Sequence, residues 1–200
     1  MSSHAQGPPT SIQLPSGRII VPTAFCYNGG PGRCASKVPG DWFAAVMYSD
    51  DLGASFSISN KEIGGNECQA APLSNGSLIL NQRTRGPQRQ LSYSYNNGAT
   101  WTEPRPVVLA GTGASTCCGS TVSVGGDSNL LVFSGPNSDS RKNMSIFTST
   151  DSGASWECLY QLGNPTLAGG YSSLAVINVR LSLTAIATSY SIARLSPGHT

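Results

Sequence analysis

Short runs in which hydrophobic and polar residues alternate recur along the chain, with turn-forming residues between them. A period of two places one face of a β-strand in a core, whereas an amphipathic helix needs a period near 3.6. No window of ten or more residues shows the helical period. The pattern therefore predicts an all-β protein. The expected strands are the alternating runs 44–48, 90–93 and 144–148 and the strand-like runs 18–21, 77–80, 129–133 and 174–177.

Three of these runs lead into one short turn motif, Ser-x-Asp-x-Gly-x-Ser/Thr followed by an aromatic residue. The copies cover residues 49–56, 94–101 and 149–156, and the second copy has Asn96 in the place of the Asp. Their starts lie 45 and 55 residues apart. A four-stranded propeller blade needs roughly 40–50 residues. The repeat therefore predicts a β-propeller.

The chemistry of the motif is that of a turn stabilised by its own side chains. An Asp or Asn accepts hydrogen bonds from backbone amides a few residues on, and the Gly permits a positive φ. The motifs end on Phe56, Trp101 and Trp156, which we expect to fill the interior of each blade. Such turns are structural, so they indicate the fold and carry no catalytic group.

Composition and charge narrow the class of protein. Only 11% of the 200 residues are charged, and 23 Gly and 13 Pro suit a turn-rich β protein. The formal net charge is +2 without a cluster of Lys or Arg, so nucleic acid is not an expected partner. No apolar run is long enough to predict a membrane span. The first residues show neither the basic start nor the apolar stretch of a signal peptide.

The cysteines and histidines give no clear site. An even number of cysteines permits disulfides, but buried free thiols fit equally well, and the spacing matches no zinc pattern. We assign no role to His4 or His199, which we expect to be solvated near the termini. Asn75 and Asn143 begin glycosylation sequons, and the compartment stays open. The six cysteines are Cys26, Cys34, Cys68, Cys117, Cys118 and Cys158.

Four polar segments between the turn motifs hold the residues that could carry chemistry. Taken singly, each has an ordinary structural explanation: a solvated carboxylate, a charged strand end, an exposed basic pair or a packing aromatic. Their order along the chain, interleaved with the turn motifs, is what makes them informative. The segments are Asn66-Glu67-Cys68-Gln69, Leu78 to Arg83, Ser140-Arg141-Lys142-Asn143 and Gly170-Tyr171-Ser172-Ser173-Leu174.

These segments resemble the second half of an exo-α-sialidase (neuraminidase), a family in which the turn motif is known as the Asp-box. The likeness runs from about residue 7 to residue 177. It implies a six-bladed β-propeller of the sialidase type, of which this chain holds about three to four blades. It also implies a partial propeller domain over residues 1–177 and a divergent or frame-altered tail over residues 178–200.

The resemblance assigns a role to each of the four residues. Tyr171 is the expected nucleophile, Glu67 its partner base, and Arg83 and Arg141 the ligands of the substrate carboxylate. Arginine presents a planar fork that binds a carboxylate through two hydrogen bonds. A neutral phenol avoids the repulsion that a carboxylate nucleophile would meet beside the carboxylate of sialic acid. Because free tyrosine has a pKa near 10, it needs a base. No metal or organic cofactor is expected.

The implied activity is the removal of terminal sialic acids from glycoproteins, glycolipids or oligosaccharides, with retention of configuration. A trans-sialidase would use the same site, and a non-catalytic glycan-binding or protein-binding Asp-box propeller is the alternative. An extracellular or lysosomal compartment is slightly favoured. The third arginine and the acid/base Asp of the family have no counterpart in this sequence, so we expect weak or no activity from this chain alone.

Overall fold

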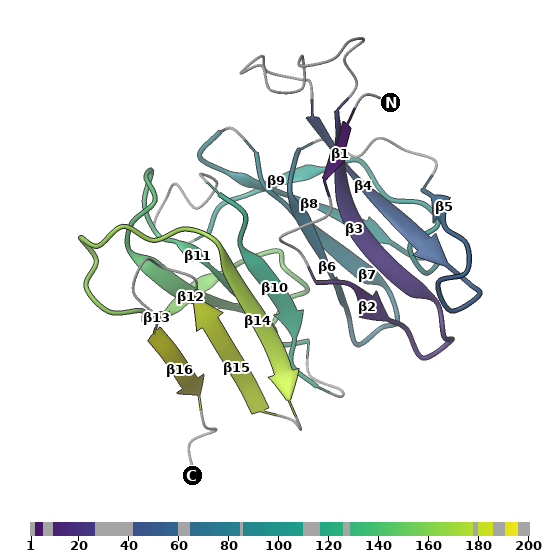
Figure 1. Cartoon of the computed structure of the whole chain (residues 1–200). Coiled ribbons are helices and arrows are strands. Elements are labelled where there is room, and N and C mark those ends of the chain that lie inside the picture. Colours follow the sequence, from purple (N-terminus) through teal and green to yellow (C-terminus); the bar gives the residue numbers. More distant parts are fainter. Residues whose placement is uncertain are drawn as a thin grey trace.

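The structure is a computed structural model in which every regular element of the described residues is a β-strand. This confirms the all-β prediction. The strands form four antiparallel sheets that follow one another across the molecule in sequence order (Figure 1). The described residues are 3–5, 10–26, 42–59, 65–84, 86–109, 117–125, 129–177, 180–185 and 191–195.

Each sheet is a meander of neighbouring strands, which is the topology of a propeller blade. Blade 1 contains β1 (Ser3–Ala5), β2 (Ile12–Gln13), β3 (Ile19–Cys26), β4 (Trp42–Ser49) and β5 (Ser57–Ile58). Blade 2 contains β6 (Cys68–Pro72), β7 (Leu78–Gln82), β8 (Arg89–Ser94) and β9 (Arg105–Val107). Blade 3 contains β10 (Ser120–Ser123), β11 (Leu131–Pro136), β12 (Met144–Ser149) and β13 (Glu157–Gln161). Blade 4 contains β14 (Ser172–Ile177), β15 (Arg180–Ala185) and β16 (Ser191–Leu195). Three fuller sheets and one three-stranded sheet agree with the expected three to four blades.

All seven expected strands are present, with ends that differ by a few residues. The strands β7 and β11 are buried at every position and were found from their runs of large apolar residues. In β6 the first four residues are also buried, but its sequence Cys-Gln-Ala-Ala-Pro has no such run. All five residues of β13 are exposed, so it shows no period of two.

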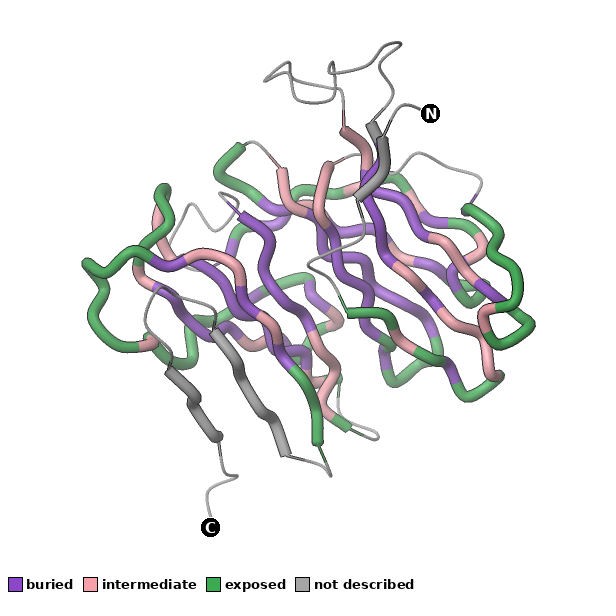
Figure 2. Tube along the Cα trace, viewed as in Figure 1, coloured by how far each residue is buried: buried purple, intermediate pink, exposed green. Residues whose placement is uncertain are grey.

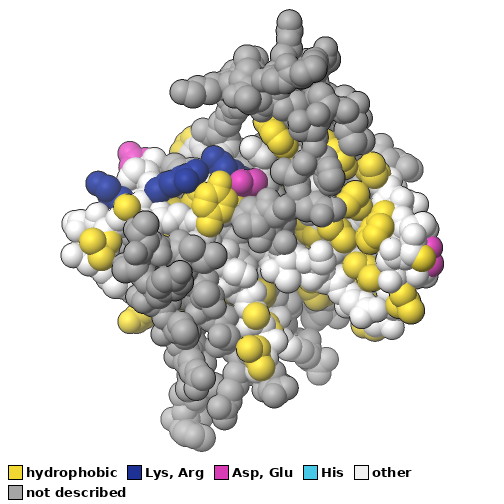
Figure 3. Space-filling view, viewed as in Figure 1, with side chains coloured by type: hydrophobic (Ala, Val, Ile, Leu, Met, Phe, Trp, Pro, Cys, Tyr) yellow, Lys and Arg dark blue, Asp and Glu magenta, His cyan; other side chains and the backbone are white. Residues whose placement is uncertain are grey.

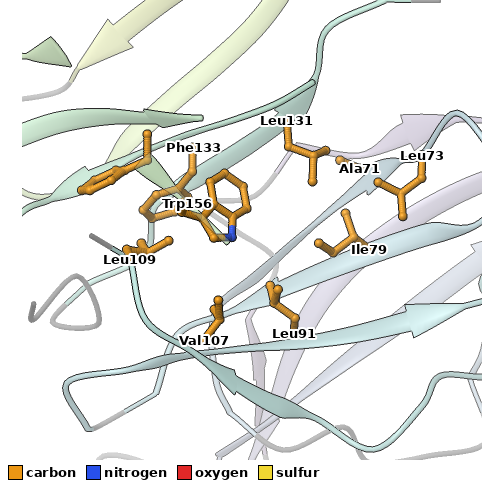
Figure 4. Packing of buried hydrophobic residues seen from close by; sticks show 10 residues of the cluster. Ala71, Leu73, Ile79, Leu91, Val107, Leu109, Leu131, Phe133 and Trp156 are labelled. Atoms are coloured by element: carbon orange, nitrogen blue, oxygen red, sulfur yellow. The ribbon is translucent and has the colours of Figure 1, made fainter. Parts of the chain in front are cut away.

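The hydrophobic core lies between the blades rather than inside each one. Cluster 1 fills the space between blades 2 and 3 and includes Ile79, Leu91, Phe133 and Trp156 (Figure 4). Cluster 2 joins blades 1 and 2 through side chains such as Ile20, Leu78, Leu80 and Trp101. Successive residues of β7 point alternately into the two clusters, so blade 2 is buried on both faces. Figure 2 shows the resulting buried interior of the central sheets.

The Asp-boxes form the expected self-stabilised turns. In the first box, Asp51 Oδ1 accepts a hydrogen bond from the Ser55 amide at 2.8 Å, and Asp51 Oδ2 accepts one from the Ser55 hydroxyl at 2.6 Å. The Ser49 hydroxyl accepts from the Gly53 amide at 2.8 Å. The two hydrogen bonds from Ser55, with one from the Ser49 hydroxyl at 2.7 Å, lower the pKa of Asp51 to about 2.

The second box keeps this geometry with an amide in place of the carboxylate. Asn96 Oδ1 accepts from the Thr100 amide at 2.9 Å, and Asn96 Nδ2 donates to the Thr100 hydroxyl at 2.8 Å. The direction of one hydrogen bond is reversed, and the turn is preserved. A serine or threonine hydroxyl can serve either direction, which explains why Asn is tolerated here.

Phe56 differs from the expectation for the closing aromatic residues. Trp101 and Trp156 are buried, with 4% of each residue exposed, whereas 47% of Phe56 is exposed. Each tryptophan packs into the cluster shared with the preceding blade. Among the described residues, no sheet lies on the corresponding side of blade 1. The prediction that Phe56 fills a blade interior is therefore wrong for this chain.

Candidate active site

The four residues expected at the site lie at one end of the blades. Glu67 immediately precedes β6 and Arg83 immediately follows β7, so both stand at the same end of one hairpin. The Arg83 amide donates to the Glu67 carbonyl at 2.8 Å and fixes this pairing. Arg141 lies in the loop between β11 and β12, and Tyr171 immediately precedes β14. The Asp-boxes occupy the opposite end of the same sheets.

The Glu67 carboxylate joins two of the other site residues. The Tyr171 hydroxyl donates to Glu67 Oε1 at 3.0 Å. Arg83 Nη1 donates to Glu67 Oε2 at 2.5 Å, in an ion pair whose side chains are 17% and 23% exposed for Glu67 and Arg83. Each carboxylate oxygen thus has a different partner, and the geometry brings a phenol, a carboxylate and a guanidinium into one partly buried contact.

Arg141 joins this group through the tyrosine ring. Its guanidinium carbon lies 5.2 Å from the centroid of the Tyr171 ring, within the range of a cation–π contact. The Gly169 amide donates to the Arg141 carbonyl at 2.8 Å, and Lys142 pairs with Ala168 in an isolated β-bridge. The loop that carries Arg141 is therefore attached to the segment that leads into Tyr171.

The surroundings of Tyr171 favour its protonated form. Burial raises the pKa of the phenol first, and the charge of Glu67 and the hydrogen bond to it raise it further. The positive charges of Arg83 and Arg141 act in the opposite direction but do not outweigh these effects. At neutral pH the proton therefore lies on Tyr171, and Glu67 is placed to accept it.

The surface view agrees with this grouping of charges. Figure 3 shows Lys and Arg side chains gathered beside an acidic side chain on one face of the molecule. Most other described side chains on that face are uncharged. A local excess of positive charge suits an anionic ligand.

Arg89 is a residue beneath the site to which sequence reasoning gave no role. It is only 1% exposed, its Nε donates to Asn81 Oδ1 at 2.5 Å, and its Nη1 donates to the Cys117 carbonyl at 3.1 Å. Its guanidinium carbon lies 4.8 Å from the centroid of the Phe133 ring. The sequence contained one signal: Arg89 stands two residues before the core residue Leu91 and so shares its face of β8.

The cysteines next to the site are free thiols. Cys68, Cys117 and Cys118 are buried and Cys158 is exposed. Burial raises the pKa of Cys118 to about 12, so this thiol is unreactive at neutral pH. Four of the six cysteines therefore fit the free-thiol alternative.

The side chains of Cys26 and His4, together with all of Cys34 and His199, lie outside the described residues. Within the described ranges, no group of three His, Cys, Asp or Glu side chains could hold a metal ion. The same part of the chain contains no helix that is long and apolar enough to cross a membrane.

Comparison with known proteins places the chain among Asp-box proteins. The family described as "BNR repeat-like domain" matches residues 2–188. Sialidase-4 of Mus musculus is 29% identical over 126 residues, which cover 60% of this chain and 26% of that protein. Trypanosoma rangeli sialidase in complex with the inhibitor DANA superposes with a TM-score of 0.72 at 20% identity, covering 95% of this chain and 31% of that chain.

A second solved structure gives the same fold. The leech intramolecular trans-sialidase complexed with 2,7-anhydro-Neu5Ac has a TM-score of 0.68 at 21% identity, covering 91% of this chain and 28% of that chain. The chain thus spans about a quarter to a third of the length of these relatives. The structural likeness establishes the sialidase-type propeller fold. With the family match over nearly the whole sequence, the chain belongs to the BNR repeat-like domain family and has sialidases as its relatives.

Proposed function

We propose that this chain carries part of the catalytic centre of an exo-α-sialidase, with Tyr171 as nucleophile and Glu67 as its base. The observation that carries the proposal is the 3.0 Å hydrogen bond between the Tyr171 hydroxyl and Glu67 Oε1. These residues are 104 positions apart and belong to different blades. A nucleophile and a base within direct hydrogen-bond reach are the minimum requirement for base-assisted attack.

In the proposed reaction, Glu67 accepts the phenolic proton while Tyr171 Oη bonds to the anomeric carbon of sialic acid. The bond between that carbon and the aglycone oxygen breaks, and the oxygen leaves with a proton from an acid. Water then cleaves the tyrosyl–sugar bond, with Glu67 returning the proton to the phenol oxygen. Two displacements at the anomeric carbon give net retention.

Arg83 and Arg141 are proposed to bind the carboxylate of the sugar. Both guanidinium groups lie beside the nucleophile, one through Glu67 and one over the ring of Tyr171. Fixed positive charge at this point holds the substrate carboxylate away from the attacking oxygen and orients the anomeric carbon. The expected substrates are sialylated glycoproteins, glycolipids or oligosaccharides, and no cofactor takes part.

Relatives with the same fold support sialic acid as the ligand. Trypanosoma rangeli sialidase is known with 2,3-difluorosialic acid as a covalent intermediate, and this reagent provides a direct test. Its leaving group is fluoride, which departs without needing a proton. Labelling therefore does not depend on the acid/base Asp for which this sequence has no counterpart.

We expect 2,3-difluorosialic acid to add one sugar mass to the protein, located at Tyr171 by peptide mapping. Tyr171→Phe should abolish the adduct. Tyr95→Phe, which alters a tyrosine that is 74% exposed, should leave it unchanged. An adduct at another residue, or one that persists in Tyr171→Phe, would contradict the assignment. Binding of sialic acid without an adduct would favour the glycan-binding propeller instead.

With natural sialosides we expect slow turnover or none from this chain alone. General acid catalysis is worth about 10²–10⁴ in rate, and the expected donor has no counterpart in this sequence. Release of sialic acid from sialyllactose at a rate typical of enzymes, roughly 1–10³ per second, would overturn this expectation. The boundary of the propeller domain at residue 177 likewise stays a prediction.

A further inference from the structure

Tyr171 and Glu67 belong to blades 4 and 2, so blade 3 lies between them and determines how far apart they stand. The first strands of the three blades are neighbours: β10 contacts β6 on one side and β14 on the other. Among the described residues, no strand ladder joins these sheets. Their relative position is therefore set by side chains, together with the backbone contacts of Arg141 and Lys142 to the segment before β14.

One such connection begins at the residue after the nucleophile. The Ser172 hydroxyl donates to the Ser134 carbonyl at 3.0 Å, and the two hydroxyl oxygens lie 2.7 Å apart. A hydroxyl has one proton. Since that of Ser172 is directed to the carbonyl, Ser134 must donate in the second contact. The residues are 4% and 0% exposed for Ser172 and Ser134, so water does not compete for these bonds.

Two further hydrogen bonds extend the connection across β10 to β6. The Leu174 amide donates to the Ser120 hydroxyl at 2.9 Å, which ties β14 to β10. The Thr121 amide donates to Gln69 Oε1 at 3.2 Å, which ties β10 to β6. The two acceptors are buried, with 1% of Ser120 and 3% of Gln69 exposed. Gln69 stands two residues after Glu67, so the connection begins and ends next to the reacting pair.

Gly119 allows the chain before β10 to approach β11 of the same blade closely. A Cβ at this position would lie 2.5 Å from the Ser134 carbonyl oxygen and 2.2 Å from ring atoms of Phe133. Both distances are far inside van der Waals contact. The backbone before β10 therefore packs directly against Ser134, whose carbonyl accepts the hydrogen bond from Ser172.

We propose that Ser134 and Ser172 are positioning residues whose buried hydroxyls set the separation of Tyr171 from Glu67. The inference rests on the proposed function of that pair, because neither serine touches the reacting atoms. Displacement of a catalytic group by about 1 Å can cost on the order of 10²-fold in rate. The hydrogen bonds of Ser172, the residue next to Tyr171, therefore fix the position of the nucleophile.

The variants Ser172→Ala and Ser134→Ala remove one hydroxyl each and retain the strand. Ser149→Ala is the matched control, since Ser149 is a buried serine of blade 3 whose hydroxyl accepts from the Gly153 amide at the far end of the sheet. All three variants should lose some thermal stability. Only Ser172→Ala and Ser134→Ala should change the position of Tyr171 relative to Glu67.

Two measurements report on the site in the intact chain. The first is the rate of labelling by 2,3-difluorosialic acid. At saturation we expect it to fall roughly 10- to 100-fold in Ser172→Ala and Ser134→Ala. The half-saturating concentration should change little, because Arg83 and Arg141 are untouched. The second is the titration of the Tyr171 phenol, followed by NMR of tyrosine labelled at Cζ and assigned with Tyr171→Phe. Among the described residues, Glu67, Arg83 and Arg141 are the charged groups that face this ring.

Ser172→Ala and Ser134→Ala should shift the Tyr171 titration in the same direction as Glu67→Gln, by a smaller amount. Ser149→Ala should match the wild type in both measurements. Unchanged labelling and titration in both serine variants, or equal loss in Ser149→Ala, would overturn the positioning role.

The same experiment separates this inference from the proposed function. If Glu67→Gln leaves the Tyr171 titration unchanged and the wild-type chain is not labelled, the catalytic pairing itself is wrong. If Glu67→Gln shifts the titration but the two serine variants do not, the pairing stands and the positioning role is wrong. Where the wild type is not labelled, the titration alone decides between these outcomes.

Discussion

Glu67 gives one oxygen to a phenol and the other to a guanidinium. This division has a chemical consequence. One oxygen of Glu67 compensates the charge of Arg83, while the other accepts the hydrogen bond of the Tyr171 hydroxyl. A carboxylate without these partners would be costly at this degree of burial.

We predict that Glu67→Gln lowers the pKa of Tyr171. The carboxylate raises that pKa through its charge and its hydrogen bond. A neutral amide removes both effects and leaves burial as the main effect that still raises the pKa. The phenol should then ionise at a lower pH, nearer its ordinary value of about 10. Titration of the Tyr171 Cζ resonance measures the change. A pKa that rises in this variant would contradict the geometry.

The residues of the site differ in how far the sequence revealed them. Glu67, Arg83, Arg141 and Tyr171 were identified through motifs shared with sialidases, and the structure places their side chains together. The serines Ser134 and Ser172 could not be found that way. A hydroxyl that bridges two sheets leaves no periodic signal, because the contact depends on packing between residues 38 positions apart.

At the scale of the element, the Asp-box does more than reverse the chain. Gly98 of the second box would place a Cβ 2.8 Å from Ile20 in blade 1, and Gly153 of the third would place one 2.6 Å from Ile79 in blade 2. The glycine turns therefore fit against the preceding blade. The motif revealed the turn from the sequence, but this second contact lies between repeats and could not be read from one of them.

We predict that Gly153→Ala and Gly98→Ala destabilise the protein more than Gly76→Ala. All three glycines have positive φ, between 81° and 91°, so each variant has backbone strain of about 1 kcal/mol. Only the first two add a clash in a packed interface, which typically costs about 1–3 kcal/mol. A Cβ at Gly76 meets nothing within 4 Å. Chemical denaturation of the three variants makes the comparison, and equal losses would refute the contact with the neighbouring blade.

The acid stability of the first Asp-box follows from the pKa of Asp51. Folding lowers it to about 2, from about 3.9 in an unfolded chain. The stability that this gives is complete above about pH 4 and is lost as the pH falls through about 2. We predict that Asp51→Asn, which mimics the natural Asn96 box, flattens the fall of Tm between pH 4 and pH 2. Asp139→Asn, at an exposed loop position, is the control and should not flatten it.

At the scale of the molecule, the blades depend on one another because their cores are shared. The sequence predicted a strand over residues 77–80, but it did not show that both faces of this strand are buried, with Leu78 and Ile79 in different clusters. Blade 2 has no interior of its own and should not remain folded without its neighbours. A domain whose core is shared in this way is expected to unfold cooperatively.

We predict that Ile79→Ala lowers stability by about 2–5 kcal/mol and that the loss is reported equally by both central tryptophans. Trp156 lies in the cluster that contains Ile79, and Trp101 lies in the other cluster. Fluorescence of variants in which Trp42 and one of these two tryptophans are replaced follows each cluster separately. Coincident transitions support a shared core, whereas earlier loss of the Trp156 signal alone would show that blades 2 and 3 separate independently.

The glycine turns give the two joints between blades 1, 2 and 3 a direction. One side of each joint is a glycine turn, and the other is an isoleucine side chain of the preceding sheet. Two such unlike surfaces cannot pair with copies of themselves, so a two-fold dimer cannot use this contact. Blades that join through such contacts follow one another head to tail. The rotation between neighbouring blades then determines how many blades form a closed ring. The number of blades is therefore encoded in a local angle between neighbours, which one extra methyl group at the turn would alter.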